Sequence, residues 1–292
     1  MTPERRALGP PEVAAIAAIN IIWAINVFAI EIPAEALPPV FAAALRFSIA
    51  LICLWPFLPI PRAQVRPMLI VAALSGPLHF GLIYVAYAMA DDVTPLIVAI
   101  QLWVPISALM ATVMLGERAS LIRWAGLIVG VAGIAVMGLD GAVAADWAAI
   151  GIGLIACSCW ALTAVLTRKY GGLPAVRMQA WTALTAAPVL FAMSAMTETG
   201  QVAAAQAAAW PVWAGLAFAA LVSSLAANGL MFALVQKVEV NRVTPWLLLY
   251  TVLAAAISVL VFGEQLTWPV ILGGAVTLAG VALVAVAERR SR

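Results

Sequence analysis

Apolar residues along this chain occur in long uninterrupted stretches separated by short groups of charged residues. A helix needs about 20 residues to cross the hydrocarbon core of a bilayer. We expect one membrane-spanning helix in each of ten stretches, residues 12–30, 38–58, 67–89, 94–115, 121–139, 147–167, 174–196, 211–235, 243–262 and 268–287. The first stretch is too long for a signal peptide and lacks a small-residue cleavage site. The pattern therefore predicts an all-α integral membrane protein without a soluble domain.

The composition agrees with a chain that is dissolved in lipid. Of the 292 residues, 65% are hydrophobic and 10% are charged, whereas soluble domains carry about a quarter charged residues. Only in hydrocarbon can most side chains be apolar on every face of a helix, which excludes an ordinary cytosolic enzyme. The net charge of +2 and the scattered basic residues give no indication of nucleic-acid binding. Cys53, Cys157 and Cys159 lie inside apolar stretches, so we expect no disulfide framework, metal site or cofactor.

The charged residues predict the orientation of the chain. Of the 15 Lys and Arg residues, all except Arg46 fall on one face of the membrane if the ten stretches alternate in direction. The opposite face has no basic residue in its loops and collects Glu31, Glu35, Asp91, Asp92, Asp140, Asp146, Glu198 and Glu264. Basic loops stay in the cytoplasm, so we expect both termini to be cytoplasmic.

The chain repeats a set of short motifs at a nearly constant interval. The fourth and ninth stretches open with Val-Thr-Pro and end with Gly-Glu, and a Gly-rich stretch follows each. The Gly-Glu pairs and two of the glycines share an offset of 147 residues, which relates Glu117 to Glu264, Gly126 to Gly273 and Gly133 to Gly280. We predict two five-helix halves, residues 1–143 and 144–292. Because five is odd, these halves have opposite topology, as in transporters with a site at the repeat interface; gene duplication alone could also leave such a repeat.

Several of these motifs match a known transporter pattern. They are the stretch from Pro105 to Glu117, the glycines from Gly126 to Gly133, and Ala44-Leu45-Arg46-Phe47. The chain resembles the EamA-type drug/metabolite transporter superfamily, and within it the YddG-type amino acid exporters. The second half departs from the pattern, because Val252 stands where Pro105 would align. The resemblance implies a basket of helices around a central cavity, which carries amino acids, including aromatic ones, out of a bacterial cell across its inner (plasma) membrane.

Polar groups deep in the predicted helices are the candidates for substrate binding, since such groups are costly in hydrocarbon. Amides and hydroxyls suit the carboxylate and ammonium of a neutral zwitterion, and ring faces suit an apolar or aromatic side chain. The alternative is that each group bonds a neighbouring helix. No catalytic residue is predicted. The expected substrate-binding residues are Asn20, Trp23, His79, Tyr84, Gln101, Trp103, Trp160, Ser224, Asn228, Trp246 and Tyr250.

The single histidine, His79, lies beside Pro77, which removes a helical hydrogen bond and frees a carbonyl group. Three roles stay open for His79: a proton relay, a substrate ligand or a packing residue. Proton-coupled carriers often use a carboxylate within the membrane. No Asp or Glu lies in the middle of a predicted helix, so the sequence favours facilitated export.

Arg46 is the one basic residue away from the cytoplasmic face, about nine residues into the second stretch. It could anchor a substrate carboxylate. It could instead be structural, bonding helix-end carbonyls or pairing with Glu31 or Glu35 by extending outward. The structural role is our expectation, because the superfamily pattern has an arginine here across varied substrates. Glu117 and Glu264 are expected to cap loops.

The leading functional hypothesis is an exporter of amino acids, with neutral and aromatic ones favoured, that works by alternating access. The alternative is an exporter of other small metabolites or drugs. A membrane enzyme is not expected, since there is no His-Glu-x-x-His, no Gly-x-Ser-x-Gly and no paired intramembrane carboxylates. A channel is disfavoured because no polar stripe follows the full length of any stretch. The expected partners are a small-molecule substrate and the lipid bilayer, with a monomer as the expectation for the oligomeric state.

Overall fold

The computed structural model describes residues 8–90, 96, 99–137, 147–262 and 267–290. This described part is helical and contains no strand, which confirms the predicted all-α class. The longer helices are α1 (Pro10–Ala36), α2 (Pro39–Leu54), α3 (Arg62–Ala73), α4 (Leu82–Met89), α6 (Trp103–Leu115), α7 (Leu121–Met137), α8 (Trp147–Tyr170), α9 (Ala175–Thr197), α11 (Trp210–Ala217), α12 (Asn228–Lys237), α14 (Leu249–Phe262) and α15 (Trp268–Arg290). The shorter segments are η1 (Trp55–Phe57), η2 (Leu74–Gly81), α10 (Gln201–Ala207), η4 (Phe218–Ala227), α13 (Val240–Val243) and η5 (Thr244–Leu248).

Eight helical segments among the described residues are long and apolar enough to cross a membrane. They coincide with eight of the predicted stretches and span Pro10–Ala36, Pro39–Phe57, Arg62–Met89, Trp147–Tyr170, Ala175–Thr197, Trp210–Lys237, Val240–Val261 and Trp268–Ala287. The predicted stretches 94–115 and 121–139 contain two shorter apolar helices, and both stretches extend into residues that the structure does not describe. The count of ten spanning helices therefore stays a prediction.

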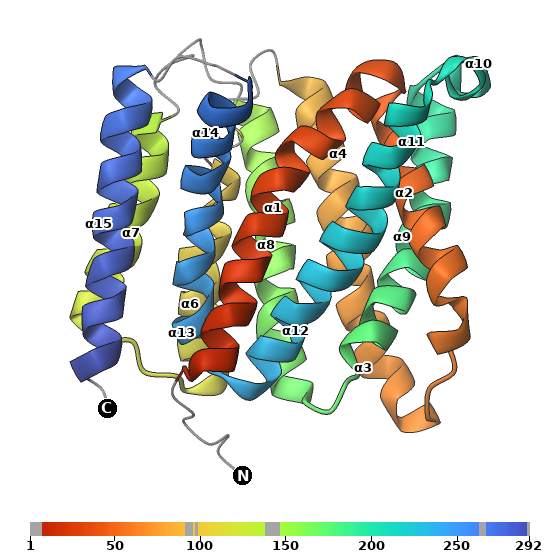
Figure 1. The fold of residues 1–292 in the computed structure, drawn as a ribbon. Helices are drawn as coiled ribbons and strands as arrows, with labels where there is room; N and C mark the ends of the chain where they lie inside the picture. Colours follow the sequence, from red (N-terminus) through yellow and green to blue (C-terminus); the bar gives the residue numbers. More distant parts are fainter. Residues whose placement is uncertain (1–7, 91–95, 97–98, 138–146, 263–266, 291–292) are drawn as a thin grey trace.

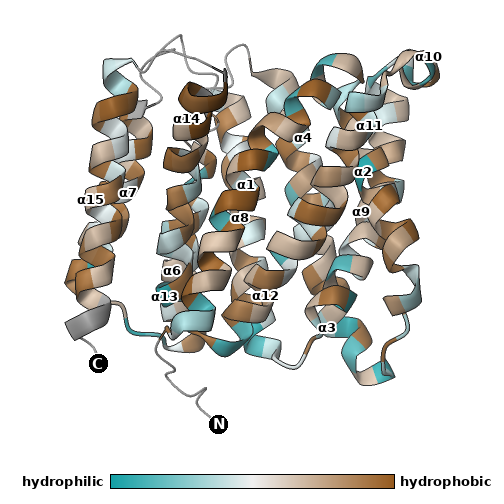
Figure 2. Cartoon of the chain, in the orientation of Figure 1, coloured by the Kyte–Doolittle hydropathy of each residue, from teal (hydrophilic) through white to brown (hydrophobic). Residues whose placement is uncertain are grey.

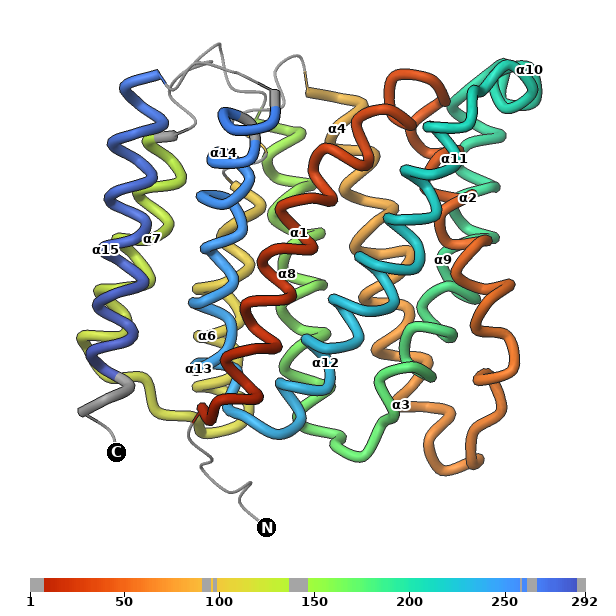
Figure 3. Tube along the Cα trace, in the orientation of Figure 1, coloured from red at the N-terminus to blue at the C-terminus, as the bar shows by residue number. Residues whose placement is uncertain are grey.

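The long helices, such as α1, α8, α9 and α15, lie roughly side by side and run from near one end of the molecule to near the other (Figure 1). Hydrophobic residues cover most of the middle of the helices, and hydrophilic residues gather near the ends (Figure 2). The start of α1 and the end of α15 lie at the same end of the molecule (Figure 3). This arrangement fits a slab of hydrocarbon around the helices with water at both ends.

Two of the membrane-spanning segments change their helical pitch midway. α3 continues into the π-helix η2 and then α4, and α11 continues into the π-helix η4 and then α12. Segments with π-type hydrogen bonding are rare and occur frequently at functional sites. η2 contains His79 and η4 contains Ser224, so both π-helices carry residues of the predicted site.

α7 and α15 run antiparallel and pack backbone against backbone (Figure 3). A Cβ atom on Gly126 would lie 2.7 Å from the carbonyl oxygen of Gly280, and a Cβ atom on Gly133 would lie 2.6 Å from the carbonyl oxygen of Gly273. At such distances a side chain would fit only if the two backbones moved apart. Helices in a bilayer associate through close packing of this kind, since lipid tails are as apolar as the helix surfaces.

Glu117 joins the end of α6 to the start of α13. Its carboxylate accepts hydrogen bonds from the backbone N–H groups of Val240 and Asn241, each at 3.0 Å. It also forms an ion pair with Arg168 of α8, whose Nε lies 2.8 Å from Oε1. Burial raises the pKa of the Glu117 carboxyl, while the two backbone N–H groups and Arg168 act in the opposite direction. The predicted capping role of Glu117 is confirmed, and Glu264 lies outside the described residues.

Glu198 makes a similar connection at the opposite end of the molecule, which the sequence analysis did not anticipate. It follows α9 and accepts hydrogen bonds from the backbone N–H groups of Val40 at 2.7 Å and Phe41 at 2.9 Å, at the start of α2. The hydroxyl of Ser194 donates to the same carboxylate at 2.7 Å. The first N–H groups of a helix have no partner within the helix and carry its positive dipole end. A carboxylate accepts hydrogen bonds from these N–H groups, and its negative charge is stabilised by the dipole.

The packing of α7 on α15 predicts that Gly280→Ala destabilises the protein. The new Cβ would lie 2.7 Å from the carbonyl oxygen of Gly126 and would collide with the backbone of Gly130. Overpacking of this kind costs about 1–3 kcal/mol, which exceeds the roughly 1 kcal/mol that alanine gains in helix propensity. We expect a lower melting temperature in detergent for Gly280→Ala than for the control Gly151→Ala, because a Cβ on Gly151 meets nothing within 4 Å. Equal melting temperatures would contradict the close contact.

Candidate substrate-binding site

Residues of four helices and of the segment before α6 form the first group of predicted site residues. We call this group the Trp23 cluster, which consists of Trp23, Gln101, Trp103, Asn228 and Tyr250. The indole Nε1 of Trp23 donates to Asn228 Oδ1 at 3.1 Å, and Gln101 Nε2 donates to the hydroxyl oxygen of Tyr250 at 2.9 Å. The ring of Trp23 makes edge contacts with the rings of Trp103 and Tyr250, with centroid distances of 6.4 and 5.7 Å.

The Trp23 cluster holds unused hydrogen-bonding capacity among aromatic rings. Tyr250 accepts a bond from Gln101, and a phenol hydroxyl that accepts a bond can still donate its own proton. Asn228 accepts through Oδ1, which leaves its Nδ2 group as a donor. Trp103 and Gln101 are buried, whereas Trp23 and Tyr250 are half-buried. The cluster can therefore contact both an apolar ring and a small polar group.

Three further predicted residues, His79, Trp160 and Ser224, lie near an arginine. We call the group around this arginine the Arg46 cluster, which consists of Arg46, His79, Phe80, Trp160 and Ser224. The ring of His79 stacks on Trp160 with centroids 5.0 Å apart and an interplanar angle of 30°, and it meets the edge of Phe80 at 4.7 Å. Arg46 donates from Nε and Nη2 to the hydroxyl of Ser224, at 3.0 and 2.8 Å. Its Cζ atom lies 5.4 Å from the centre of the Phe80 ring.

The hydrogen bond of His79 determines its tautomer. Its Nδ1 lies 2.9 Å from the carbonyl oxygen of Ala156 in α8. A carbonyl oxygen only accepts, so Nδ1 carries the proton and Nε2 of the neutral ring is an acceptor. His79 thus offers a bound molecule an acceptor, while its donor is used within the protein.

Three of the predicted site residues lie outside both clusters. The amide of Asn20 donates to the carbonyl oxygen of Ile16 in its own helix, at 2.8 Å. Tyr84 packs against the apolar side chains between α2 and α9, among them Leu190. The indole nitrogen of Trp246 is buried and finds no acceptor among the described residues. For these three residues, a role in substrate binding stays a prediction.

The structural partners predicted for Arg46 were wrong. The guanidinium bonds Ser224 rather than helix-end carbonyls, and Glu31 and Glu35 are exposed and form no ion pair with it in the described structure. Phe80 was not predicted as a site residue. Its one signal in the sequence is its position directly after His79, and its contact with Arg46 depends on how α2 packs beside η2.

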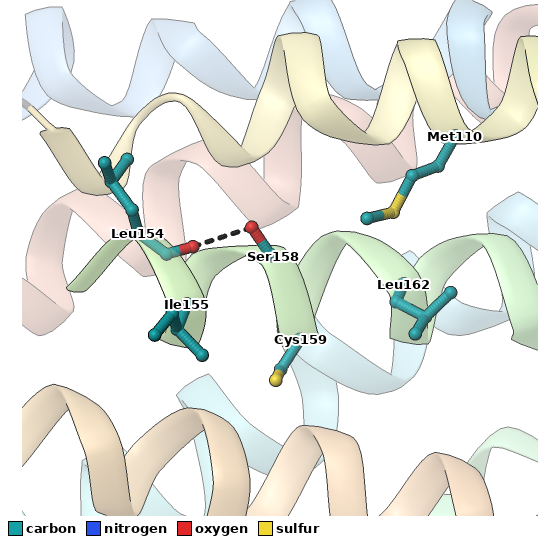
Figure 4. Close-up of a pocket in the computed structure, with 6 residues that line it drawn as sticks. All are labelled: Met110, Leu154, Ile155, Ser158, Cys159 and Leu162. Atoms are coloured by element: carbon teal, nitrogen blue, oxygen red, sulfur yellow. Dashed lines mark hydrogen bonds between the residues drawn. The ribbon is translucent and has the colours of Figure 1, made fainter. Parts of the chain in front are cut away.

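A separate pocket of about 310 Å³ lies between α6 and α8 and contains none of the predicted site residues. It opens onto the surface at Ile155, which is 58% exposed. The hydroxyl of Ser158 donates to the carbonyl oxygen of Leu154 at 2.7 Å, so its donor is already used. No group of three or more side chains that could hold a metal ion occurs in the part of the chain that the structure describes. The pocket is lined by Met110, Leu154, Ile155, Ser158, Cys159 and Leu162 (Figure 4).

Comparisons with known proteins identify what this arrangement resembles. The model of the EamA-like transporter family matches the chain twice, over residues 11–139 and 147–286. The "Uncharacterized inner membrane transporter YedA" of Escherichia coli strains K12 and O157:H7 is 28% identical over 269 residues, which cover 88% of this chain and 85% of the relative. A crystal structure described only as that of a protein has the same fold, with a TM-score of 0.79 and 16% identity over 97% of this chain and 99% of that chain.

The bond between His79 and Ala156 predicts the protonation state of the imidazole. Because the chain has one histidine, selective ¹⁵N-histidine labelling reports this ring alone. We expect the solid-state NMR spectrum of the protein in lipid at pH 7 to show a protonated Nδ1 and an unprotonated Nε2. A ring protonated at Nε2 alone, or at both nitrogens, would contradict the assignment.

Proposed function

The chain belongs to the EamA-like transporter family, and on that premise we propose that it exports amino acids, above all neutral and aromatic ones, from the cytoplasm. It is a multi-pass membrane transporter rather than an enzyme. The Trp23 cluster is the observation that supports this class of substrate. Its rings offer flat apolar surfaces to a side chain, and Asn228 and Tyr250 offer donors and acceptors to a zwitterion.

The proposed architecture consists of ten membrane-spanning helices in two inverted five-helix repeats, residues 1–143 and 144–292, around a central cavity. The family model matches once in each of these segments, which supports the repeat. The π-helices η2 and η4 occupy the third and eighth predicted helices, which are equivalent positions in the two repeats.

The contact between α7 and α15 supports the inverted relation of the repeats. The offset of 147 residues makes Gly126 equivalent to Gly273, and Gly133 equivalent to Gly280. Gly126 meets Gly280, and Gly133 meets Gly273. A two-fold axis between α7 and α15 requires this pairing. If Gly126 contacts Gly280, the equivalents of these two residues, Gly273 and Gly133, must also be in contact. Two equivalent helices that pack antiparallel cross the membrane in opposite directions, as inverted repeats do.

We propose that the protein lies in the bacterial inner membrane with both termini in the cytoplasm and works by alternating access. The name of the relative YedA refers to an inner membrane transporter, and the basic residues follow the positive-inside pattern. Glu117 and Glu198 join helices at opposite ends of the molecule (Figure 1). Opening at the end with the termini would break the bonds of Glu117 to α13 and Arg168. Opening at the other end would break those of Glu198 to α2.

A second candidate function is the export of lipophilic drugs or other small metabolites. The observation that favours it is the apolar pocket of Figure 4, which opens at the surface of α8 and offers no free hydroxyl donor. A lipophilic molecule could enter such a pocket from the bilayer, whereas a zwitterion would lose its hydration there without compensation.

Growth assays separate the two candidates. Cells that express the protein are grown on toxic concentrations of individual amino acids or dipeptides, and on lipophilic drugs. We expect resistance to phenylalanine and other neutral amino acids, because export lowers their internal concentration. Resistance to drugs alone would contradict amino acid export and favour the second candidate.

Variants of the Trp23 cluster test its part in this export. Asn228→Ala and Tyr250→Ala are each expected to lower phenylalanine flux in liposomes about tenfold, since one lost hydrogen bond of about 1.4 kcal/mol has that effect on a rate. The control is Ser48→Ala, whose hydroxyl bonds the Ala44 carbonyl of its own helix at 2.8 Å. If the Asn228 and Tyr250 variants instead gave a low yield of folded protein, but normal flux for each molecule that folds, these residues would only contribute to packing.

A further inference from the structure

Arg46 is a buried cation in the middle of α2. Its side chain is 7% exposed, and a guanidinium keeps its charge at every accessible pH. A charged side chain at the bilayer centre costs roughly 2.5–3.5 kcal/mol on insertion scales, so such residues are paired or functional. The question is therefore which group balances the charge of Arg46.

The described residues around Arg46 are neutral. Nε and Nη2 both donate to one hydroxyl, that of Ser224, although a guanidinium has five N–H donors. The rings of Phe47 and Phe80 lie 5.8 and 5.4 Å from its Cζ atom. No carboxylate in the described residues lies within ion-pair distance of Arg46. Its charge is stabilised by ring faces and one hydroxyl alone.

Other buried arginines of the same chain show what a structural arginine has here. Arg168 is 6% exposed and pairs with Glu117 at 2.8 Å, and Arg242 is 7% exposed and pairs with Glu239 at 2.7 Å. Arg168 is in the last turn of α8 and Arg242 is in α13, and α13 lies near the end of the molecule where α1 begins (Figure 1). Arg46 is as buried as these two residues and has no such carboxylate partner in the part of the chain that the structure describes.

We propose that Arg46 binds the carboxylate of the transported molecule. This inference rests on the proposed function and specifies its substrate class: the molecule needs a free carboxylate, and amides and amines of the same shape are rejected. A guanidinium is planar and presents parallel N–H donors, which match the two oxygens of a carboxylate. Ser224 holds Nε and Nη2 and thereby fixes the plane of the guanidinium.

The surroundings of Arg46 fit the rest of an amino acid. Phe80 lies between Arg46 and His79, within 5.4 Å of the guanidinium carbon and 4.7 Å of the imidazole centre. The ring of Trp160 continues the aromatic surface beyond His79. Nε2 of His79 is an acceptor, because Nδ1 bonds Ala156. The carboxylate thus has a cationic donor, the ammonium has an acceptor, and an apolar side chain has ring faces.

Ligand pairs that differ only in their charge test the anchor. The full chain is purified in detergent, and the Kd values of phenylacetate and phenylacetamide are measured from the shift in melting temperature. We expect phenylacetate to bind at least tenfold more tightly than phenylacetamide. Arg46→Gln is expected to remove this difference. The control Arg62→Gln, which removes the same charge from an exposed position at the start of α3, is expected to keep it.

Three results would overturn the proposal: wild-type protein that binds no phenylacetate, wild-type protein that binds both ligands equally, or an Arg46→Gln variant that keeps the tenfold difference.

If Arg46→Gln does not fold, Arg46→Lys replaces it, because lysine keeps the charge and loses the planar fork. A several-fold weaker phenylacetate Kd is then expected, and an unchanged Kd contradicts the anchor. Arg46-dependent phenylacetate binding without amino acid export would refute the proposed function alone. Amino acid export with an unchanged carboxylate preference in Arg46→Gln would refute the anchor alone.

Discussion

The structure depends on one constraint, which is that hydrocarbon offers no partner to a polar group. The described backbone satisfies this constraint by being helical. The N–H groups at the start of α2 and α13 receive carboxylates from Glu198 and Glu117. The constraint also explains why so few polar side chains lie deep in the helices, and why those that do so bond either a neighbouring helix or a carbonyl of their own helix. In this chain the polar groups that remain form two clusters with aromatic rings.

The same solvent determines how the helices associate. Since burying apolar surface gains nothing in lipid, α7 and α15 pack through glycines that allow their backbones to touch. Helices that carry the site also meet closely at glycines: a Cβ atom on Gly76 of η2 would lie 2.9 Å from the carbonyl oxygen of Thr182 in α9, and one on Gly215 of α11 would collide with the carbonyl oxygen of Ala29 in α1. Within the Trp23 cluster, rings from different helices contact one another, and Asn228 and Tyr250 keep unused bonding capacity. Small residues thus join helices in several parts of the molecule, while the rings and polar groups of the two clusters form the region suited to binding.

Much of the fold could be predicted from the sequence, because the length of an apolar stretch is a local property. Eight predicted stretches coincide with helices of spanning length, and Glu117 caps a helix as expected. The partners of polar residues could not be predicted in this way. Ser224 and Asn228 are four residues apart, and regular helical spacing places them on one face, yet Ser224 bonds Arg46 and Asn228 bonds Trp23. The π-helix η4 contains Ser224 and ends directly before Asn228. It changes the number of residues per turn, so an argument from regular helical spacing assigns the faces incorrectly.

The central claim is that the region between the two proposed repeats opens alternately to each side of the membrane. The most direct measurement labels Ser224→Cys with a membrane-impermeant maleimide, in a chain whose native Cys53, Cys157 and Cys159 are replaced by serine and which is first shown to retain phenylalanine flux in liposomes. Right-side-out and inside-out vesicles expose opposite faces to the reagent. The account predicts labelling from both sides, slowed in each case by phenylalanine. Labelling from one side only, or labelling that phenylalanine leaves unchanged, would contradict it.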